Sequence, residues 1–124
     1  MSPAVTKGQL EAKIAAAITQ FEREHLGRGP QEVRAWIIQD LILLRLRKVL
    51  TPAEEKLARD PEGHRLVKEL RMKLIEGSRS MLDHIVFELT GAEVISLHSD
   101  ISVHTGERVF VFTLAHDLEA RLGK

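Results

Sequence analysis

The stretch Pro61–Leu89 constrains the fold more than any other part of the sequence. Apolar residues recur through it at helical spacing, and Asp60 before it and Gly91 after it are residue types that favour helix ends. One unbroken helix of this length would measure roughly 43 Å, about the width of the whole domain or more. We therefore expect a break at Gly77, or packing against something outside the domain. The expected apolar stripe is Val67, Leu70, Leu74, Met81, Leu82, Ile85 and Leu89.

Small residues lie along one edge of this stripe, because Gly63, Leu70, Gly77 and His84 are spaced seven apart. A small residue lets another backbone come close, and two interpretations remain open. The close contact lies within the chain, or it forms a helix–helix seam between two copies. The stripe also predicts that Leu70→Asp or Ile85→Asp unfolds the domain, because an unpaired buried carboxylate is costly.

Two β-hairpins are predicted on either side of the helical region. Val33–Ile38 and Leu41–Lys48 flank a two-residue turn, and one face of this hairpin is wholly apolar, so we expect that face against helices. The second hairpin follows Gly91 and turns at Thr105-Gly106. The facing pairs of the first hairpin are Arg34 with Arg45, Trp36 with Leu43, and Ile38 with Leu41. The apolar side of the third strand is expected to carry Ile95, Leu97, Ile101 and Val103.

The elements together predict one α+β domain over residues 1–124. An amphipathic helix is expected over about Lys7–His25, and a shorter one starts at the capping sequence Thr51-Pro52-Ala53-Glu54. Residues 1–6 are expected to be a loose N-terminus and residues 117–124 a short tail. The two hairpins form an antiparallel four-stranded sheet, with the N-terminal helix and the long central helix packed on one face. The sequence leaves open whether the hairpins join within one chain or across a dimer.

Composition limits the classes of function. The chain has no cysteine, which excludes disulfides, thiolate metal sites and cysteine nucleophiles and suits a reducing cytoplasm. Lys and Arg together number 18, equal to Asp and Glu, so bulk electrostatic binding to nucleic acid or membrane is not expected. No apolar run is long enough for membrane insertion, and the first residues lack a signal-peptide core. We expect a cytoplasmic protein without a cofactor.

Several short motifs resemble those of a family of small bacterial proteins. They are Gly27-Arg28-Gly29-Pro30, Leu50-Thr51-Pro52-Ala53-Glu54 with Leu57, Gly63 with Val67 and Arg71, Leu89-Thr90-Gly91, Ser99-Asp100, and Thr105-Gly106 before Val109-Phe110-Val111-Phe112. The family is named after the C component of a Na+-translocating, membrane-potential-generating system (MpsC-like). The resemblance implies an α+β domain linked to a membrane ion- or bicarbonate-translocating system. It brings no catalytic residues.

The polar face of the first hairpin is the main candidate site for a partner or ligand. Arg34 and Arg45 face each other, with Arg47 beside them. Because like charges that face each other across strands are destabilising, we expect acidic side chains to pair with these arginines. Asp100 or Glu119 is expected to supply these acids. Trp36, Ile38, Leu41 and Leu43 share the face, and leaving them bare would expose a sizeable apolar patch. The cover is expected to be the tail helix or a second subunit; otherwise the face binds a ligand or nucleic acid.

Two weaker candidates complete the set. His98 and Asp100 lie close enough on one strand to share a metal ion, although a solvent-facing polar side of the sheet explains them equally well. Gly27, Arg28 and Gly29 offer backbone amides and a guanidinium to an anion, or simply form a tight turn between helix and strand.

These observations favour a non-enzymatic accessory or regulatory domain that acts by protein–protein contact. A homodimer is expected, with a membrane-transport component as a possible further partner. The alternative is a small nucleic-acid-binding domain that uses the face of Arg34, Trp36, Arg45 and Arg47.

Overall fold

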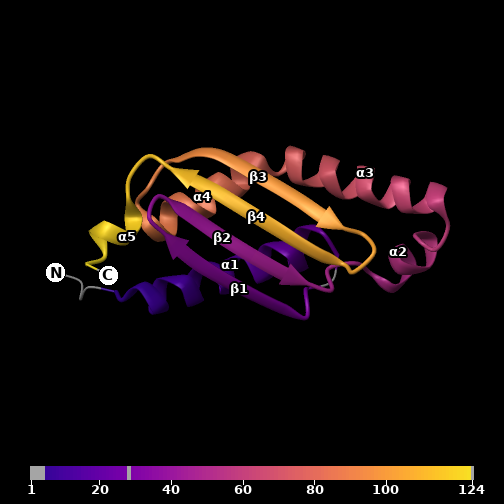
Figure 1. Cartoon of the computed structure of the whole chain (residues 1–124), viewed down its shortest axis with the longest axis horizontal. Coiled ribbons are helices and arrows are strands. Elements are labelled where there is room, and N and C mark those ends of the chain that lie inside the picture. Colours follow the sequence, from indigo (N-terminus) through magenta and orange to yellow (C-terminus); the bar gives the residue numbers. More distant parts are fainter. Residues whose placement is uncertain (1–4, 28, 124) are drawn as a thin grey trace.

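The computed structural model describes residues 5–27 and 29–123, and it has a four-stranded antiparallel sheet with helices on one face (Figure 1). The predicted α+β class is confirmed. In chain order the elements are α1 (Lys7–His25), β1 (Glu32–Ile38), β2 (Leu41–Arg47), α2 (Pro52–Leu57), α3 (Pro61–Gly77), α4 (Arg79–Thr90), β3 (Val94–Ser102), β4 (Glu107–Leu114) and α5 (Leu118–Arg121).

The two hairpins join within one chain, which resolves the alternative that the sequence left open. The strand order is β1-β2-β4-β3, so the second strand of each hairpin lies in the middle of the sheet. The predicted register of the first hairpin is confirmed, with Arg34 opposite Arg45 and Trp36 opposite Leu43. Leu44 of β2 pairs with Phe110 of β4 at the junction.

The core lies between the sheet and the helices behind it, as the apolar alternation of the strands predicts. Helix α1 packs on β1 and on α4. Its stripe of Leu10, Ile14, Ile18 and Phe21 is at most 3% exposed. The sheet contributes the buried side chains Ile37, Ile42, Leu44, Leu46, Phe110, Phe112 and Leu114.

The helical region breaks where the sequence predicts, because α3 ends at Gly77 and α4 begins at Arg79. The face that the two helices bury is rotated from the expected stripe. Leu70 is 48% exposed and Met81 is 42% exposed, so the prediction that they belong to one buried stripe is wrong. The expectation that Leu70→Asp unfolds the domain loses its basis as well. The buried positions of the two helices are Gly63, Val67, Arg71, Ile75, Leu82, Val86 and Thr90.

The predicted helix boundaries rest on caps that the structure confirms. Thr51 and Glu54 form the capping box at the start of α2, and the Asp60 carboxylate accepts from Gly63 N at 2.8 Å. Gly91 ends α4 with a φ of 71°, in the left-handed region that favours glycine. At the N-terminus, Thr6 caps α1, and residues 1–4 lie outside the described part of the chain.

The third strand departs from the predicted alternation at Ile95. Val94 pairs with Leu114 and Ser96 pairs with Thr113, so Ile95 is an extra residue in a β-bulge. It is 57% exposed, and its expected place on the apolar face is wrong. Ile101 and Val103 are buried as predicted.

The close contact expected at Gly63 lies within the chain. A Cβ atom at this position would come 1.8 Å from the carbonyl oxygen of Leu57, which belongs to α2. A Cβ at Gly77 would meet no atom within 4 Å. Gly63 therefore sets how closely α2 approaches α3.

Gly63→Ala should destabilise the protein, because the new methyl group collides with backbone that cannot move freely. We expect a loss of about 2 kcal/mol or more in the free energy of unfolding, measured by urea denaturation. Gly77→Ala is the matched control and should be neutral or stabilising by up to about 1 kcal/mol. Equal effects of the two substitutions would contradict the close contact between α2 and α3.

Candidate functional site: the open face of the sheet

Over residues 5–27 and 29–123, one face of the sheet has no helix in front of it (Figure 1). The strand register arranges its side chains in rows that cross all four strands. One row runs Trp36, Leu43, Val111, His98. The next row runs Arg34, Arg45, Val109, Asp100. We call this surface the open face.

The open face is about half apolar. Trp36, Leu41 and Leu43 are only partly buried, and Ile38 is 46% exposed at its end. Val109 and Val111 continue the apolar area across β4 and are also partly buried. A contiguous apolar area framed by charges is typical of a protein–protein contact surface.

Two of the three arginines on this face form ion pairs, and their partners are not the acids that the sequence predicted. Arg45 forms an ion pair with Glu107 of β4, and Arg47 lies 3.7 Å from Glu32 of β1. Arg34 stacks its guanidinium over the Trp36 ring at 5.5 Å from the ring centroid, a cation–π contact.

Asp100 and Glu119, the acids expected to pair with the arginines, bind lysines instead. Asp100 lies 3.4 Å from Lys68 of α3, and Glu119 lies 2.7 Å from Lys7 of α1. That part of the prediction is wrong. A hydrogen bond from the backbone N–H of Ile101 is the main reason why the pKa of Asp100 falls below its ordinary value.

The tail helix does not cover the open face. Helix α5 lies at the end of the sheet beside the β1–β2 turn, where Glu119 N donates to the carbonyl of Gln39 at 3.2 Å (Figure 1). Of the two expected covers, the tail is excluded over the described residues, and the second subunit stays a prediction.

The weaker candidates gain no support from their surroundings. His98 and Asp100 stay exposed on β3, and among the described residues no group of three His, Asp or Glu side chains gathers as a metal site would require. Gly27 and Gly29 flank Arg28, which lies outside the described residues. Gly27 has a φ of 112°, so turn geometry accounts for this glycine. A Cβ on Gly29 would come 3.0 Å from Nε of the Arg23 side chain.

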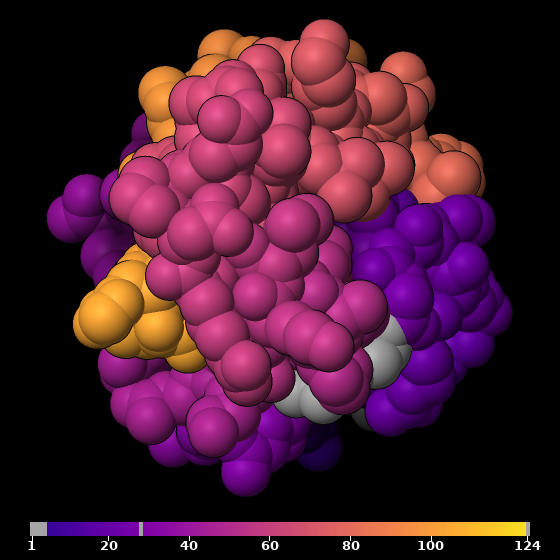
Figure 2. Space-filling view, turned by 90° about the vertical axis from the view of Figure 1, so that its right-hand side faces the viewer, coloured from indigo at the N-terminus to yellow at the C-terminus, as the bar shows by residue number. Residues whose placement is uncertain are grey.

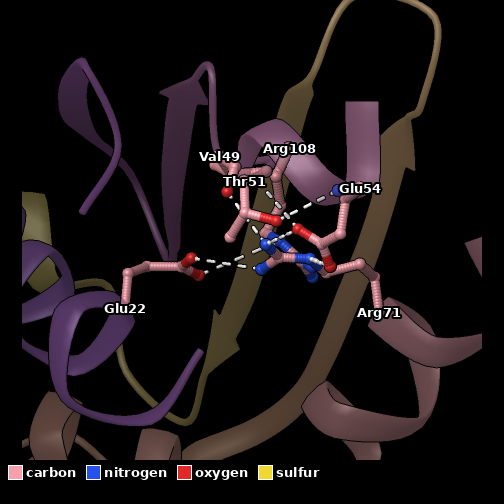
Figure 3. Close-up of polar contacts among 6 residues, drawn as sticks. All are labelled: Glu22, Val49, Thr51, Glu54, Arg71 and Arg108. Atoms are coloured by element: carbon pink, nitrogen blue, oxygen red, sulfur yellow. Dashed lines mark hydrogen bonds and ion pairs between the residues drawn. The ribbon is translucent and has the colours of Figure 1, made fainter. Parts of the chain in front are cut away.

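A buried charged cluster lies on the opposite side of the sheet, where sequence reasoning assigned no site. Arg71 of α3 donates to both carboxylate oxygens of Glu54 at 2.6 and 3.0 Å and to the carbonyl of Val49 at 2.9 Å (Figure 3). Glu22 of α1 lies 3.9 Å from Arg71 and 3.9 Å from Arg108 of β4. The two positive charges of the guanidinium groups thus equal the two negative charges of the carboxylates, and the four side chains come from α1, α2, α3 and β4.

Burial decides the protonation chemistry of this cluster. Desolvation raises the pKa of Glu22 above its ordinary value, although Arg108 and Arg71 oppose this. Desolvation also lowers the pKa of Arg108 to about 10, against the attraction of Glu22. Burial pushes the pKa of Glu54 upward too, but hydrogen bonds from Arg71 and the Thr51 backbone prevail and lower it.

The cluster is closed to solvent. The side chains of Glu22, Arg71 and Arg108 are 0% exposed, and that of Glu54 is 15% exposed. At this end of the molecule, α2 and the start of α3 form the surface between α1 and the β3–β4 turn (Figure 2). The cluster therefore fixes the positions of the helices on the sheet and offers no surface to a partner.

The sequence does contain a signal for this cluster. Arg108 occupies the inward position of β4 in the alternation with Phe110 and Phe112, and Glu22 adjoins the α1 stripe beside Phe21. A charged residue at a core position predicts a buried partner of opposite charge. The pairing itself joins residues more than eighty positions apart, which periodicity does not reveal.

These features define a small α+β domain that has one sheet face free of helices. The chain belongs to the MpsC family, described as "Na+-translocating membrane potential-generating system (MpsC)", whose sequence model matches residues 6–116. The predicted resemblance is thereby confirmed.

Two proteins of Bacillus subtilis (strain 168) are similar to the chain. YbcI, itself described as uncharacterised, is 42% identical over 119 residues, which cover 96% of both chains. YrhF, also described as uncharacterised, is 28% identical over 103 residues, which cover 82% of this chain and 84% of its own. No solved structure matches the chain significantly. Within the described residues, no helix has the length and apolar content that crossing a membrane requires.

Arg71→Met should strongly destabilise the fold, because it leaves Glu54 without its cation and removes one of the two guanidinium groups that face Glu22. We expect a loss of about 3–5 kcal/mol in the free energy of unfolding, measured by urea denaturation. Arg65→Met on the exposed side of α3 is the matched control. It breaks only surface ion pairs and should cost less than about 1 kcal/mol. Similar losses in both variants would show that the buried cluster does not stabilise the fold.

The lowered pKa of Glu54 predicts a pH dependence with a defined sign. Its ionised form is favoured in the folded state, so its contribution to stability is fully present above the ordinary pKa of 4.5 and is lost as the pH falls below it. The difference in unfolding free energy between wild type and Glu54→Gln should therefore shrink between about pH 7 and about pH 3.5. Urea denaturation across this range measures it. A difference that is constant or grows towards acid would contradict the assignment.

Proposed function

We propose that this protein is a non-enzymatic cytoplasmic domain that acts by protein–protein contact through its open face. The observation that supports this proposal most directly is the uncovered, half-apolar sheet face around Trp36, Leu43 and Val111. A sheet face of this kind is stabilised when another apolar surface removes it from water. Its charges are mostly paired, and paired charges around an apolar centre suit recognition of a protein.

The family description suggests with which system this contact is made. Its description names a Na+-translocating system that generates membrane potential. A domain without a membrane-spanning helix over its described residues can join such a system through contact with another component. We propose an accessory or regulatory role beside a membrane ion- or bicarbonate-translocating system.

The nucleic-acid alternative is less well supported by the charges of the open face. Arg45 and Arg47 have carboxylate partners, Glu107 and Glu32, on the same face. Only Arg34, stacked on Trp36, keeps the arrangement that a base-stacking surface uses. The two carboxylates that pair with these arginines would repel a phosphate backbone.

Trp36→Glu tests the proposal, because it places a charge within the apolar area. Affinity capture from cells that produce the protein at its natural level should retain a component of an ion-translocating membrane system with the wild type. The Trp36→Glu variant should lose that component while circular dichroism stays native. Leu66→Glu is the control, since Leu66 is an apolar residue on α3 that is 43% exposed and does not belong to the open face.

Two results would overturn the proposal. One is that Trp36→Glu retains the same partners as the wild type. The other is that the wild type retains nucleic acid whose binding weakens steeply with salt, which would favour the alternative.

A further inference from the structure

Charges on the open face are divided between its two halves. The β1–β2 half carries three arginines, Arg34, Arg45 and Arg47, against the single acid Glu32. The β4–β3 half carries two acids, Glu107 and Asp100, and among the described residues its strands place no Lys or Arg on this face, because Arg108 points into the core. Lys68 of α3 lies 3.4 Å from Asp100, and the Asp100 side chain stays 69% exposed beside it. Such a surface is complementary to a copy of itself that is turned so that opposite halves meet.

We infer that the open face binds the open face of a second copy, about a two-fold axis that runs parallel to the strands between β2 and β4. This inference rests on the proposed function, because it names the first occupant of the same surface. Stacked sheets keep their strands roughly aligned, which this axis permits. Most soluble homo-oligomers are two-fold dimers, in which one patch meets itself.

The strand order fixes which residues meet. Turning the sheet about this axis lays β1 over the partner's β3 and β2 over the partner's β4, and each row meets the same row. Arg34 then faces the partner's Asp100, because both belong to one row. In the adjoining row Leu43 faces the partner's Val111, so apolar residues meet in the middle.

A two-fold axis that runs parallel to the sheet plane but perpendicular to the strands would not bring the arginines opposite the acids. It lays β1 over β1 and β2 over β2 of the second copy, so the half that holds the arginines meets itself. Like charges that meet across an interface cost several kcal/mol and disfavour that arrangement. The charge distribution therefore selects the axis parallel to the strands.

The open face is small for an interface. Four strands spaced about 4.8 Å apart and about 23 Å long give a flat patch near the lower end of specific interfaces. We expect association in the micromolar range, at which sedimentation equilibrium resolves monomer and dimer.

Charge reversal at the Arg34–Asp100 contact tests the geometry. Arg34→Asp alone sets two acids against each other, and Asp100→Arg alone sets two arginines against each other. Each variant should raise the dimer dissociation constant about tenfold or more. Mixing the two variants should restore association, since each mixed contact again joins one acid and one base. Leu66→Glu, on the α3 surface, should leave the constant unchanged, and circular dichroism checks the fold of each variant.

Four outcomes would overturn the inference. They are a wild type that stays monomeric at high micromolar concentration, single variants that associate as wild type does, a mixture that does no better than either variant alone, and loss of association in Leu66→Glu. A monomeric wild type whose Trp36→Glu variant still loses a captured partner would refute the second copy and leave the proposed function standing. A dimer that Trp36→Glu and both charge variants leave intact would refute the open face as a contact surface.

Discussion

In the described part of the chain, helices cover only one of the two faces of the sheet, and the rest of the structure depends on this one-sided cover. Helix α1 lies behind β1 and contacts α4, while α3 runs beside the free edge of β3. The strands nevertheless carry apolar side chains on both faces, including Trp36 and Leu43 on the uncovered one. An antiparallel sheet can face water on one side, but that side is then expected to be polar. The apolar half of the open face is therefore the feature that calls for a partner.

Charges serve different purposes on the two sides of the sheet. On the helix side, Glu22, Arg71, Arg108 and Glu54 balance within a closed space and hold four elements in place. A buried network of this kind is costly to break, so it fixes the position of α2 and α3 on the sheet. On the open side the charges are exposed and are grouped by sign along the strand order. A rigid sheet keeps this grouping in register, as the proposed contact with a second copy requires.

Local signals predicted most of the fold. The apolar alternation and the even turn of the first hairpin predicted its register, and capping residues such as Thr51 and Asp60 predicted helix starts. The errors came from features that periodicity does not carry. Helix α3 turns Val67, Arg71 and Ile75 inward, which leaves Leu70 at the surface, and a bulge exposes Ile95. The pairings of Asp100 with Lys68 and of Glu22 with Arg108 join distant segments, so no local pattern reveals them.

The fluorescence of Trp36 tests most directly whether the open face is covered in solution. Trp36 is the only tryptophan of the chain, so its emission reports on this face alone. If a second copy covers the face, raising the protein concentration through the micromolar range should shift the emission to shorter wavelength and protect it from acrylamide quenching. An emission wavelength and a quenching constant that do not change with concentration would contradict a self-associating open face.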